Sequence, residues 1–498
     1  MASPEYRELL MRVEELSTLE QAAGILGWDE RTCMQPGSAP DRARQNAVMS
    51  GIMHERLTSK EMGRLIRSLK KQELSADGTV ILREVERKWR LASAVPGDLV
   101  KEISQTQSMA TNAWAKARSE SSFELLEPWL EKTIGLKCKL AEHIGYEDKP
   151  YDALLDEYEP NARSRDIDAV FARLKKKLVP LAARILNEPG LNGSHTPAGK
   201  YPVASQSAFV AGLVSDMGFD MDRGRVDVSA HPFTSGACRD VRITVRYNEA
   251  DPSYVVFPAM HEAGHALYDQ GFAEKYYCTP LAEGVSMGIH ESQSRLWENM
   301  VGRSRHFWSF YYPKFRQAFP AFKNMPMDAF YEHVNAVKRS YIRTDADEVT
   351  YNLHVMLRYD VERALFDGKL KTKEIPSYWN ELSEKYLGIP VPDDARGCLQ
   401  DIHWAAGSFG YFPTYTLGNI YAAQLWAAMR RQVPGTEESI EAGDLGVPLK
   451  WLRRNVHRHG KRYCAEDLIK KATGEKLNED HFIRYIKEKY GPIYGIKL

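Results

Sequence analysis

The spacing of apolar residues constrains this 498-residue chain more than any other feature of its sequence. Apolar side chains recur at intervals of three and four residues along most of the chain, a spacing that places them on one side of a helix. The first such run comprises Leu9, Leu10, Val13, Leu16 and Leu19. A strand would alternate at every second residue instead. We therefore expect a mainly α protein.

Two segments depart from this helical pattern. Gly, Pro, Asn and Ser cluster at residues 187–202, which predicts a long loop or a join between subdomains. Residues 240–247 alternate, with Val241, Ile243 and Val245 on one face and Arg242, Thr244 and Arg246 on the other. This pattern predicts a strand in one small sheet, and we expect that strand to be able to pair with an extended peptide by edge addition.

Composition argues against several classes of partner. Lys plus Arg and Asp plus Glu both total 67, so no net charge attracts nucleic acid or an anionic membrane surface. The chain has no apolar run of about 18 residues, and its amino terminus lacks the apolar stretch of a signal peptide. The six cysteines form no CxxC pair, which is typical of reduced thiols. We expect a cytoplasmic protein that binds neither nucleic acid nor membrane.

Residues 261–265 read His-Glu-Ala-Gly-His. Pro258 suits the start of a helix over this motif and Gly271 suits its end. Residues four apart share a helix face, so His261 and His265 can bind one metal ion while Glu262 lies beside it as a general base. The alternative interpretation is two ordinary histidines on an amphipathic helix.

A catalytic zinc site of this type needs a third protein ligand. Glu291 is the candidate, on an expected helix 26 residues after His265. Glu283 and Glu298 are alternatives on spacing alone, and periodicity does not choose among the three. We expect the adjacent His290 to face elsewhere.

The chain also contains the motifs His231-Pro232-Phe233, Asp240-x-Arg242-x-Thr244, His290-Glu291-Ser292, Ile342-Arg343-x-x-Ala346-Asp347 and Gly397-x-x-Gln400-Asp401-x-His403-Trp404. Together with the HExxH, they resemble the motifs of the carboxypeptidase Taq family of metallocarboxypeptidases. An amino-terminal segment from Gly27-Trp28-Asp29 to Arg44-Gln45 is also similar, with one departure, Gln35 inserted before Pro36. The resemblance therefore spans nearly the whole chain.

This resemblance implies a large helical, neurolysin-like fold, with a deep active-site groove and the small sheet beside the zinc helix. Residues 1–498 would form one peptidase unit of two helical lobes, usually as a homodimer in the cytoplasm. It assigns Glu291 as the third zinc ligand, and cobalt can substitute for zinc at such a site. Related enzymes often place an aspartate four residues after this glutamate, but Arg295 stands here, so sequence does not identify the residue that orients the zinc histidines.

The implied activity is release of single amino acids from the free carboxyl terminus of peptides. Glu262 would take a proton from the attacking water and pass it to the leaving amine. His403 and a tyrosine, Tyr415 in preference to Tyr411, are candidates for stabilising the carbonyl oxygen.

A guanidinium binds a terminal carboxylate well, and Arg343 is the first candidate for that role. Arg242 would limit substrate length, and His231 would donate to the substrate backbone. One alternative function is a thimet- or neurolysin-like oligopeptidase, against which Arg343 argues. The other is a non-catalytic, zinc-stabilised peptide-binding protein, which would not need Glu262.

Overall fold

The computed structural model describes residues 3–497 except 190 and 192–194, and most of them are helical. The α-helices are α1 Pro4–Thr32, α2 Ala39–Thr58, α3 Lys60–Leu69, α4 Ala76–Ala94, α5 Gly97–Glu120, α6 Glu127–Ile144, α7 Pro150–Leu155, α8 Ser164–Leu186, α9 Val203–Asp216, α10 Ser253–Asp269, α11 Met287–Arg295, α12 Arg305–Ala318, α13 Met327–Val334, α14 Tyr351–Phe366, α15 Ile375–Leu387, α16 Phe412–Gln432, α17 Thr436–Glu441, α18 Gly446–Asn455, α19 Ala465–Thr473 and α20 Asp480–Tyr494. A π-helical segment, η6 Leu296–Val301, continues α11. The prediction of a mainly α protein is confirmed.

The strands β1 Gly224–Val228, β2 Thr234–Ala237 and β3 Asp240–Val245 form one small sheet. Its order is β1-β3-β2, with β1 parallel and β2 antiparallel to β3. Val241, Ile243 and Val245 are fully buried, as their alternation predicted. The expectation that this strand pairs with a peptide is wrong, because β3 is the central strand and both of its edges are already hydrogen-bonded.

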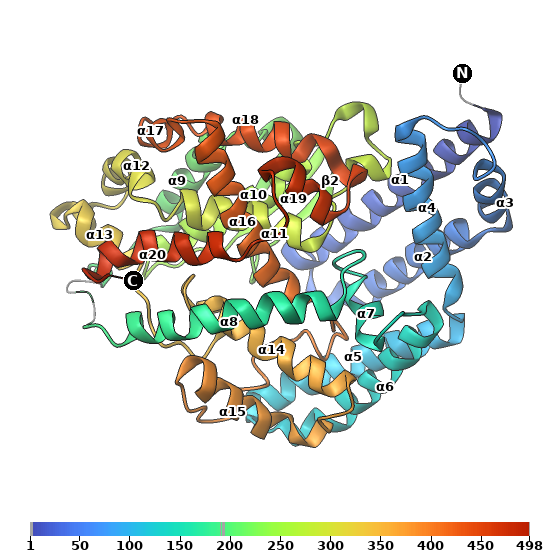
Figure 1. Ribbon diagram of the computed structural model, residues 1–498, viewed down its shortest axis with the longest axis horizontal. Helices are drawn as coiled ribbons and strands as arrows, with labels where there is room; N and C mark the ends of the chain where they lie inside the picture. The colour runs from blue at the N-terminus through green and yellow to red at the C-terminus, as the bar shows by residue number, and fades with distance from the viewer. Residues whose placement is uncertain (1–2, 190, 192–194, 498) are drawn as a thin grey trace.

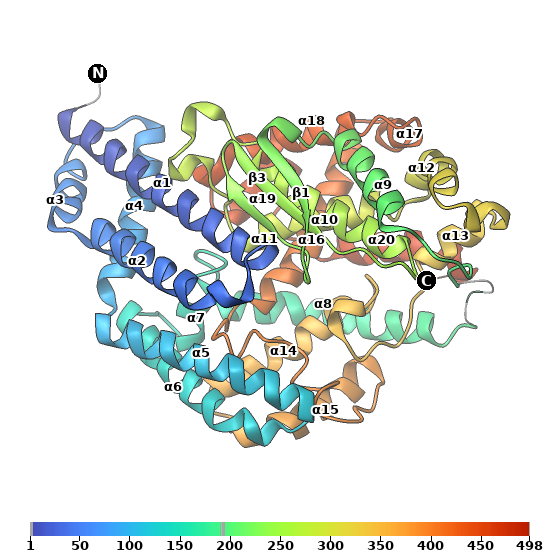
Figure 2. The same ribbon diagram turned by 180° about the vertical axis from the view of Figure 1, so that it is seen from behind.

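The helices pack around one large apolar core that runs from Ala110 to Tyr490, and a second, smaller core lies among α1, α3 and α4. In Figure 1, α5–α8, α14 and α15 lie in the lower part of the molecule and α9–α13 with α16–α20 in the upper part. Helices α1–α4 lie at one end. Figure 2 shows the sheet on the opposite face, beside α1 and α9.

Two glycines allow three helices to approach closely around the HExxH motif. A side chain on Gly264 of α10 would meet the backbone of Ser294 at 2.7 Å, and one on Gly418 of α16 would meet Glu291 at 2.5 Å. Helix α11 therefore lies between α10 and α16 with almost no space on either side. This packing holds Glu291 against the helix that carries the histidines.

Two local expectations are modified by the structure. Pro258 lies inside α10 and does not start it; the helix begins at Ser253, because burying Val255, Val256 and Phe257 outweighs the hydrogen bond that a proline cannot make. Residues 187–202 do separate two helices, α8 and α9, although 190 and 192–194 lie outside the described residues. Among the described residues, no helix is long and apolar enough to cross a membrane.

Candidate metal centre

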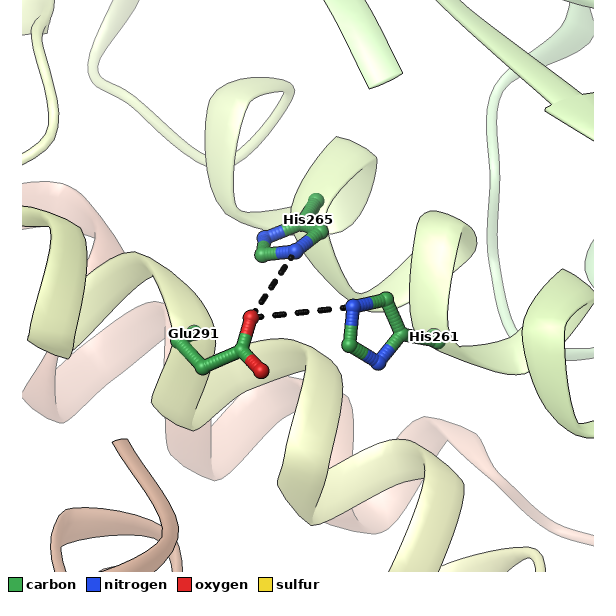
Figure 3. Close-up of side chains that lie close together, drawn as sticks. All are labelled: His261, His265 and Glu291. Carbon is green, nitrogen blue, oxygen red and sulfur yellow. Dashed lines mark ion pairs between the residues drawn. The ribbon is translucent and has the colours of Figure 1, made fainter. Parts of the chain in front are cut away.

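Three side chains converge where α10 faces α11. His261 and His265 project from one face of α10, and Glu291 projects from α11 towards them (Figure 3). Oε2 of Glu291 lies 3.6 Å from Nε2 of His261 and 3.4 Å from Nε2 of His265. The ligand atoms of the three residues all lie within 4.8 Å of one another. Two imidazole nitrogens and one carboxylate oxygen therefore point at a common position.

These separations fit a tetrahedral metal ion. Zinc–ligand distances of about 2.0–2.1 Å place neighbouring tetrahedral ligands about 3.3 Å apart. The two distances from Glu291 are close to that value. Three protein ligands leave one coordination position for water or substrate, as in catalytic zinc sites.

The other two carboxylates with suitable spacing have different partners. Glu283 forms ion pairs with Lys88 and Lys461, at 2.8 Å and 2.6 Å. Glu298 contacts His261 on the opposite side of the ring, with Oε2 2.9 Å from Nδ1. Packing of α11 thus distinguishes Glu291 from residues that sequence periodicity could not exclude.

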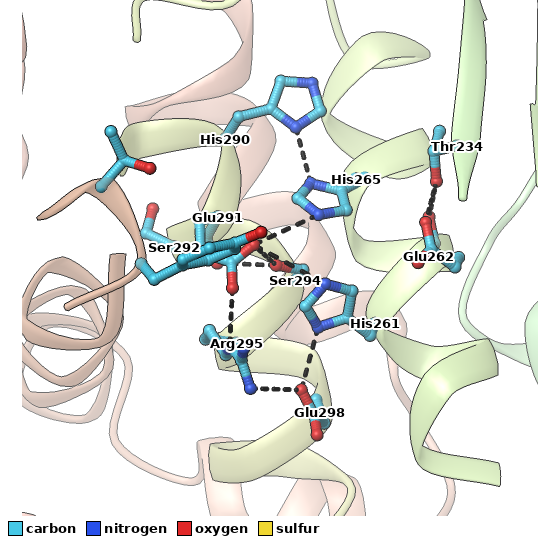
Figure 4. A network of polar contacts seen from close by, with 12 residues as sticks. Thr234, His261, Glu262, His265, His290, Glu291, Ser292, Ser294, Arg295 and Glu298 are labelled. Atoms are coloured by element: carbon cyan, nitrogen blue, oxygen red, sulfur yellow. Dashed lines mark hydrogen bonds and ion pairs between the residues drawn. The ribbon is translucent and has the colours of Figure 1, made fainter. Parts of the chain in front are cut away.

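Glu298 and Arg295 form a polar layer behind His261 and Glu291 (Figure 4). Arg295 donates from Nε to Glu291 Oε1 at 2.6 Å and from Nη1 to Glu298 Oε2 at 3.2 Å. The position that holds aspartate in related enzymes therefore carries a cation here, and Glu298, three residues further on, orients His261. Residues 291, 295 and 298 share one helix face, which is why they meet.

His265 has its own orienting partner. Its Nδ1 lies 2.6 Å from Nδ1 of His290, whose Nε2 lies 3.1 Å from Asp269 Oδ1. The expectation that His290 faces elsewhere is wrong, because the close approach of α10 and α11 places it against His265. If Nε2 of His265 binds a metal, its Nδ1–H donates to His290, and Nε2–H of His290 donates to Asp269.

The electrostatics of the cluster favour protonation states that suit a metal at His265 and Glu291. Burial lowers the pKa of His265 to about 3, so its ring is neutral. Burial alone would raise the pKa of Glu291, but Arg295 and His261 hold it well below its usual range. Burial would lower the pKa of His261, yet Glu291 and Glu298 raise it. Protons therefore compete with a metal mainly at His261.

Glu262 lies on the side of α10 that faces the sheet. Thr234 of β2 donates from Oγ1 to Glu262 Oε2 at 2.6 Å and contacts the Glu262 carbonyl oxygen at 3.0 Å (Figure 4). Burial raises the pKa of Glu262 above its usual value. A buried carboxylate with a raised pKa beside a metal site is suited to accept a proton.

Two predicted tyrosines lie at the start of α16. Nε2 of His403 is 3.4 Å from the hydroxyl of Tyr415, and the ring of Tyr411 lies 5.2 Å from that of Tyr415. Burial raises the pKa of Tyr411 to about 12 and that of Tyr415 well above its ordinary value, so both hydroxyls keep their protons. His403, Tyr411 and Tyr415 therefore form one cluster of potential donors.

Arg343 lies beside this cluster and is buried. Its guanidinium carbon is 4.9 Å from the centre of the Tyr415 ring, and Nη1 donates to the hydroxyl of Tyr351 at 2.8 Å. The ring of Tyr351 also stacks with Arg295, at 4.2 Å, and Arg295 contacts Glu291. Arg343 is thus linked to the metal cluster through two side chains.

The remaining two predicted residues lie apart from this cluster. Arg242 forms a two-pronged ion pair with Asp240, at 2.8 Å and 2.7 Å, and stacks 4.7 Å from the Trp28 ring, beside a cavity of about 50 Å³. His231 is exposed between β1 and β2, and its carbonyl accepts a hydrogen bond from Ser229. In the described part of the chain, neither side chain contacts His261, His265 or Glu291.

Comparisons with known proteins agree with this architecture over the whole chain. The family described as carboxypeptidase Taq (M32) metallopeptidase matches residues 8–490. The chain is 40% identical over 488 residues to thermostable carboxypeptidase 1 of Pyrococcus furiosus, covering 97% of this chain and 98% of that protein. It is 38% identical over 494 residues to carboxypeptidase 1 of Bacillus subtilis, covering 98% of each. The crystal structure of the M32 carboxypeptidase from Deinococcus radiodurans R1 is 37% identical, with a TM-score of 0.95 over 99% of this chain and 100% of that one.

Proposed function

The chain belongs to the carboxypeptidase Taq (M32) family of metallopeptidases, and we propose that it uses zinc to release single amino acids from the free carboxyl terminus of peptides. It is a carboxypeptidase with a metal cofactor. The observation that carries the proposal for zinc is the convergence of His261, His265 and Glu291 at tetrahedral separations. Cobalt, which accepts the same ligands, would substitute.

Glu262 is the proposed general base. When bound, zinc would polarise the scissile carbonyl and lower the pKa of a water towards neutrality. Glu262 would accept a proton from that water as the water oxygen attacks the carbonyl carbon. The same carboxyl would then protonate the leaving amine. Burial and the hydrogen bond from Thr234 support this role, because they hold one orientation of a proton-accepting group.

His403, Tyr415 and Tyr411 are proposed to stabilise the carbonyl oxygen as it gains negative charge. A hydroxyl that keeps its proton can donate to such an oxygen, and its effect is larger where water is excluded. Tyr415 is the first candidate because its hydroxyl lies 3.4 Å from Nε2 of His403 and its ring lies 4.9 Å from the guanidinium carbon of Arg343.

Arg343 is proposed to bind the terminal carboxylate. Of the five N–H groups of a guanidinium, three donate here, two to Asp401 and one to Tyr351. One N–H on each terminal nitrogen remains without an acceptor among the described residues. Two such groups can bind both oxygens of a carboxylate at once.

Two further residues have proposed roles in substrate binding. Arg242 would limit peptide length and His231 would contact the substrate backbone, although both lie apart from the metal cluster. A homodimer and a cytoplasmic location are proposed from the family. Sedimentation analysis of the purified protein tests the dimer.

The experiment that tests the proposed function compares a short peptide with its carboxyl-amidated twin. Each is incubated with metal-loaded protein, with chelated protein and with chelated protein reloaded with zinc or cobalt, and products are followed by mass spectrometry. Stepwise loss of single residues from the free peptide alone, abolished by chelation and restored by zinc, is expected. Internal cleavage of both peptides would instead indicate an oligopeptidase.

A further inference from the structure

Asp401 is shared between two buried arginines. Its Oδ1 accepts from Arg343 Nη2 at 2.9 Å, and its Oδ2 accepts from Arg358 Nε at 2.6 Å. Arg358 is fully buried on α14, donates from Nη1 to the carbonyl of His354 at 2.7 Å, and stacks 4.6 Å from the Trp379 ring. Arg358 therefore binds the oxygen of Asp401 that Arg343 leaves free.

The charges of Arg343, Arg358 and Asp401 do not cancel. Burial lowers the pKa of Arg358 only to about 10, while Arg343 and Arg358 hold the pKa of buried Asp401 well below its usual range. Two cations and one anion leave one positive charge near neutral pH. The adjacent histidines add none, because burial lowers the pKa of His403 to about 4 and that of His354 well below its usual value. Burying an uncompensated charge is costly, so its retention needs an explanation.

We propose that Arg358 is a positioning residue. It balances the charge of Asp401 and so leaves Arg343 free to bind one terminal carboxylate. This inference rests on the proposed role of Arg343. Without Arg358, Asp401 would neutralise Arg343 and repel an incoming carboxylate at close range. With Arg358 present, Asp401 fixes the orientation of Arg343 while the group keeps one net positive charge to complement the substrate.

The competing explanation is that Arg358 only packs the core. Its guanidinium lies between Trp379 and Phe412, at 4.6 Å and 5.5 Å, so removing it would disturb aromatic packing whatever the charge. Nη2 of Arg358 is buried and has no hydrogen-bond partner among the described residues, so the guanidinium does not use all of its donors. A test must therefore change charge and packing separately.

The experiment measures KM and kcat on the free-carboxyl peptide for zinc-loaded wild type, Arg343→Met, Arg358→Met, Arg358→Lys and the double variant Arg358→Met/Asp401→Asn. Zinc content and Tm are recorded for each. A carboxylate that keeps its charge throughout the reaction is bound equally in the ground and transition states, so its loss raises KM more than it lowers kcat. Arg358→Met is expected to raise KM about tenfold or more. Arg358→Lys keeps the charge but loses the planar group that stacks on Trp379, so its KM should lie between those of wild type and Arg358→Met, nearer wild type.

The double variant decides between charge and packing. It removes Arg358 and the charge of Asp401 together, which restores one net positive charge on Arg343, so KM should return most of the way to wild type. Continued loss in the double variant, or equal loss in Arg358→Lys, would overturn the inference. If Arg358→Met does not fold, Arg358→Gln, which removes the charge but keeps hydrogen-bonding groups, takes its place in both comparisons. A raised KM for Arg343→Met with an unchanged KM for Arg358→Met would refute the inference alone, whereas no effect of Arg343→Met would refute the proposed role of Arg343 as well.

Discussion

Glu298 Oε2 lies 2.9 Å from Nδ1 of His261, the ring nitrogen that faces away from Glu291. A carboxylate in this position fixes the tautomer and the orientation of a metal-binding histidine and makes its other nitrogen more basic. Arg295 holds Glu298 from the side, with Nη1 3.2 Å from the same oxygen. Glu298 therefore belongs to the candidate metal site although its carboxylate does not point into the cluster.

Glu298→Ala should lower zinc affinity about 10- to 100-fold, because His261 loses the group that orients it. Competition with a chromogenic chelator measures the dissociation constant directly. Glu381→Ala, at an exposed position on α15, is the matched control and should bind zinc as the parent does. An unchanged zinc affinity in Glu298→Ala would show that helix packing alone orients His261.

His290→Phe should also weaken zinc binding, because Nδ1 of His265 loses the acceptor 2.6 Å away. The expected loss is about tenfold or more, by the same chelator competition. Phenylalanine keeps a ring of similar shape between α10 and α11, so Tm should change little. A large fall in Tm with unchanged zinc affinity would assign His290 to packing.

Thr234→Val should lower kcat about tenfold while zinc content stays constant, because the carboxylate of Glu262 loses the hydroxyl that orients it at 2.6 Å. Valine keeps the shape of the side chain. Thr234→Ser keeps the hydroxyl and should recover most of the rate. If serine and valine variants lose kcat equally, the hydroxyl is not what matters at this position.

Zinc affinity should fall as pH decreases through the raised pKa of His261. The protonated ring cannot bind a metal, and a raised pKa means that protonation begins at a higher pH than for an ordinary histidine. Glu298→Gln removes one of the carboxylates that raise this pKa, so the loss of affinity should move to lower pH. Chelator competition at a series of pH values measures both curves, and coincident curves would contradict this assignment.

The relative placement of His261 and His265 could be predicted from the sequence because helical periodicity is local. The i and i+4 positions of His261 and His265 and the central burial of Val241, Ile243 and Val245 depend on a few consecutive residues. The choice of Glu291 over Glu283 and Glu298 depended on family resemblance, because it is decided by how α11 packs between α10 and α16. Gly264 fills an unspecified position of the HExxH motif and Gly418 lies outside the motifs named above, so neither glycine signals this packing in the sequence.

The sequence did not predict the partners of Glu262 and Arg358, because these contacts join residues that are far apart in the chain. The contact of Thr234 with Glu262 joins residues 28 apart, and that of Asp401 with Arg358 joins residues 43 apart. Thr234 directly follows the His-Pro-Phe motif and Asp401 lies within the Gln-Asp-x-His motif. Their positions in or beside motifs did not predict which residues they contact. The order of the strands could not be predicted either, because alternation of apolar and polar residues indicates a strand but not whether that strand is central in its sheet.

We propose that Glu262 is the base of a zinc site formed by His261, His265 and Glu291. Turnover by zinc-loaded Glu262→Gln tests this most directly. Glutamine keeps the shape of the side chain but cannot accept the proton. We expect one zinc per chain, as in the parent, and a kcat lower by about 10²- to 10⁴-fold. A variant with bound zinc and a kcat close to that of the parent would contradict it.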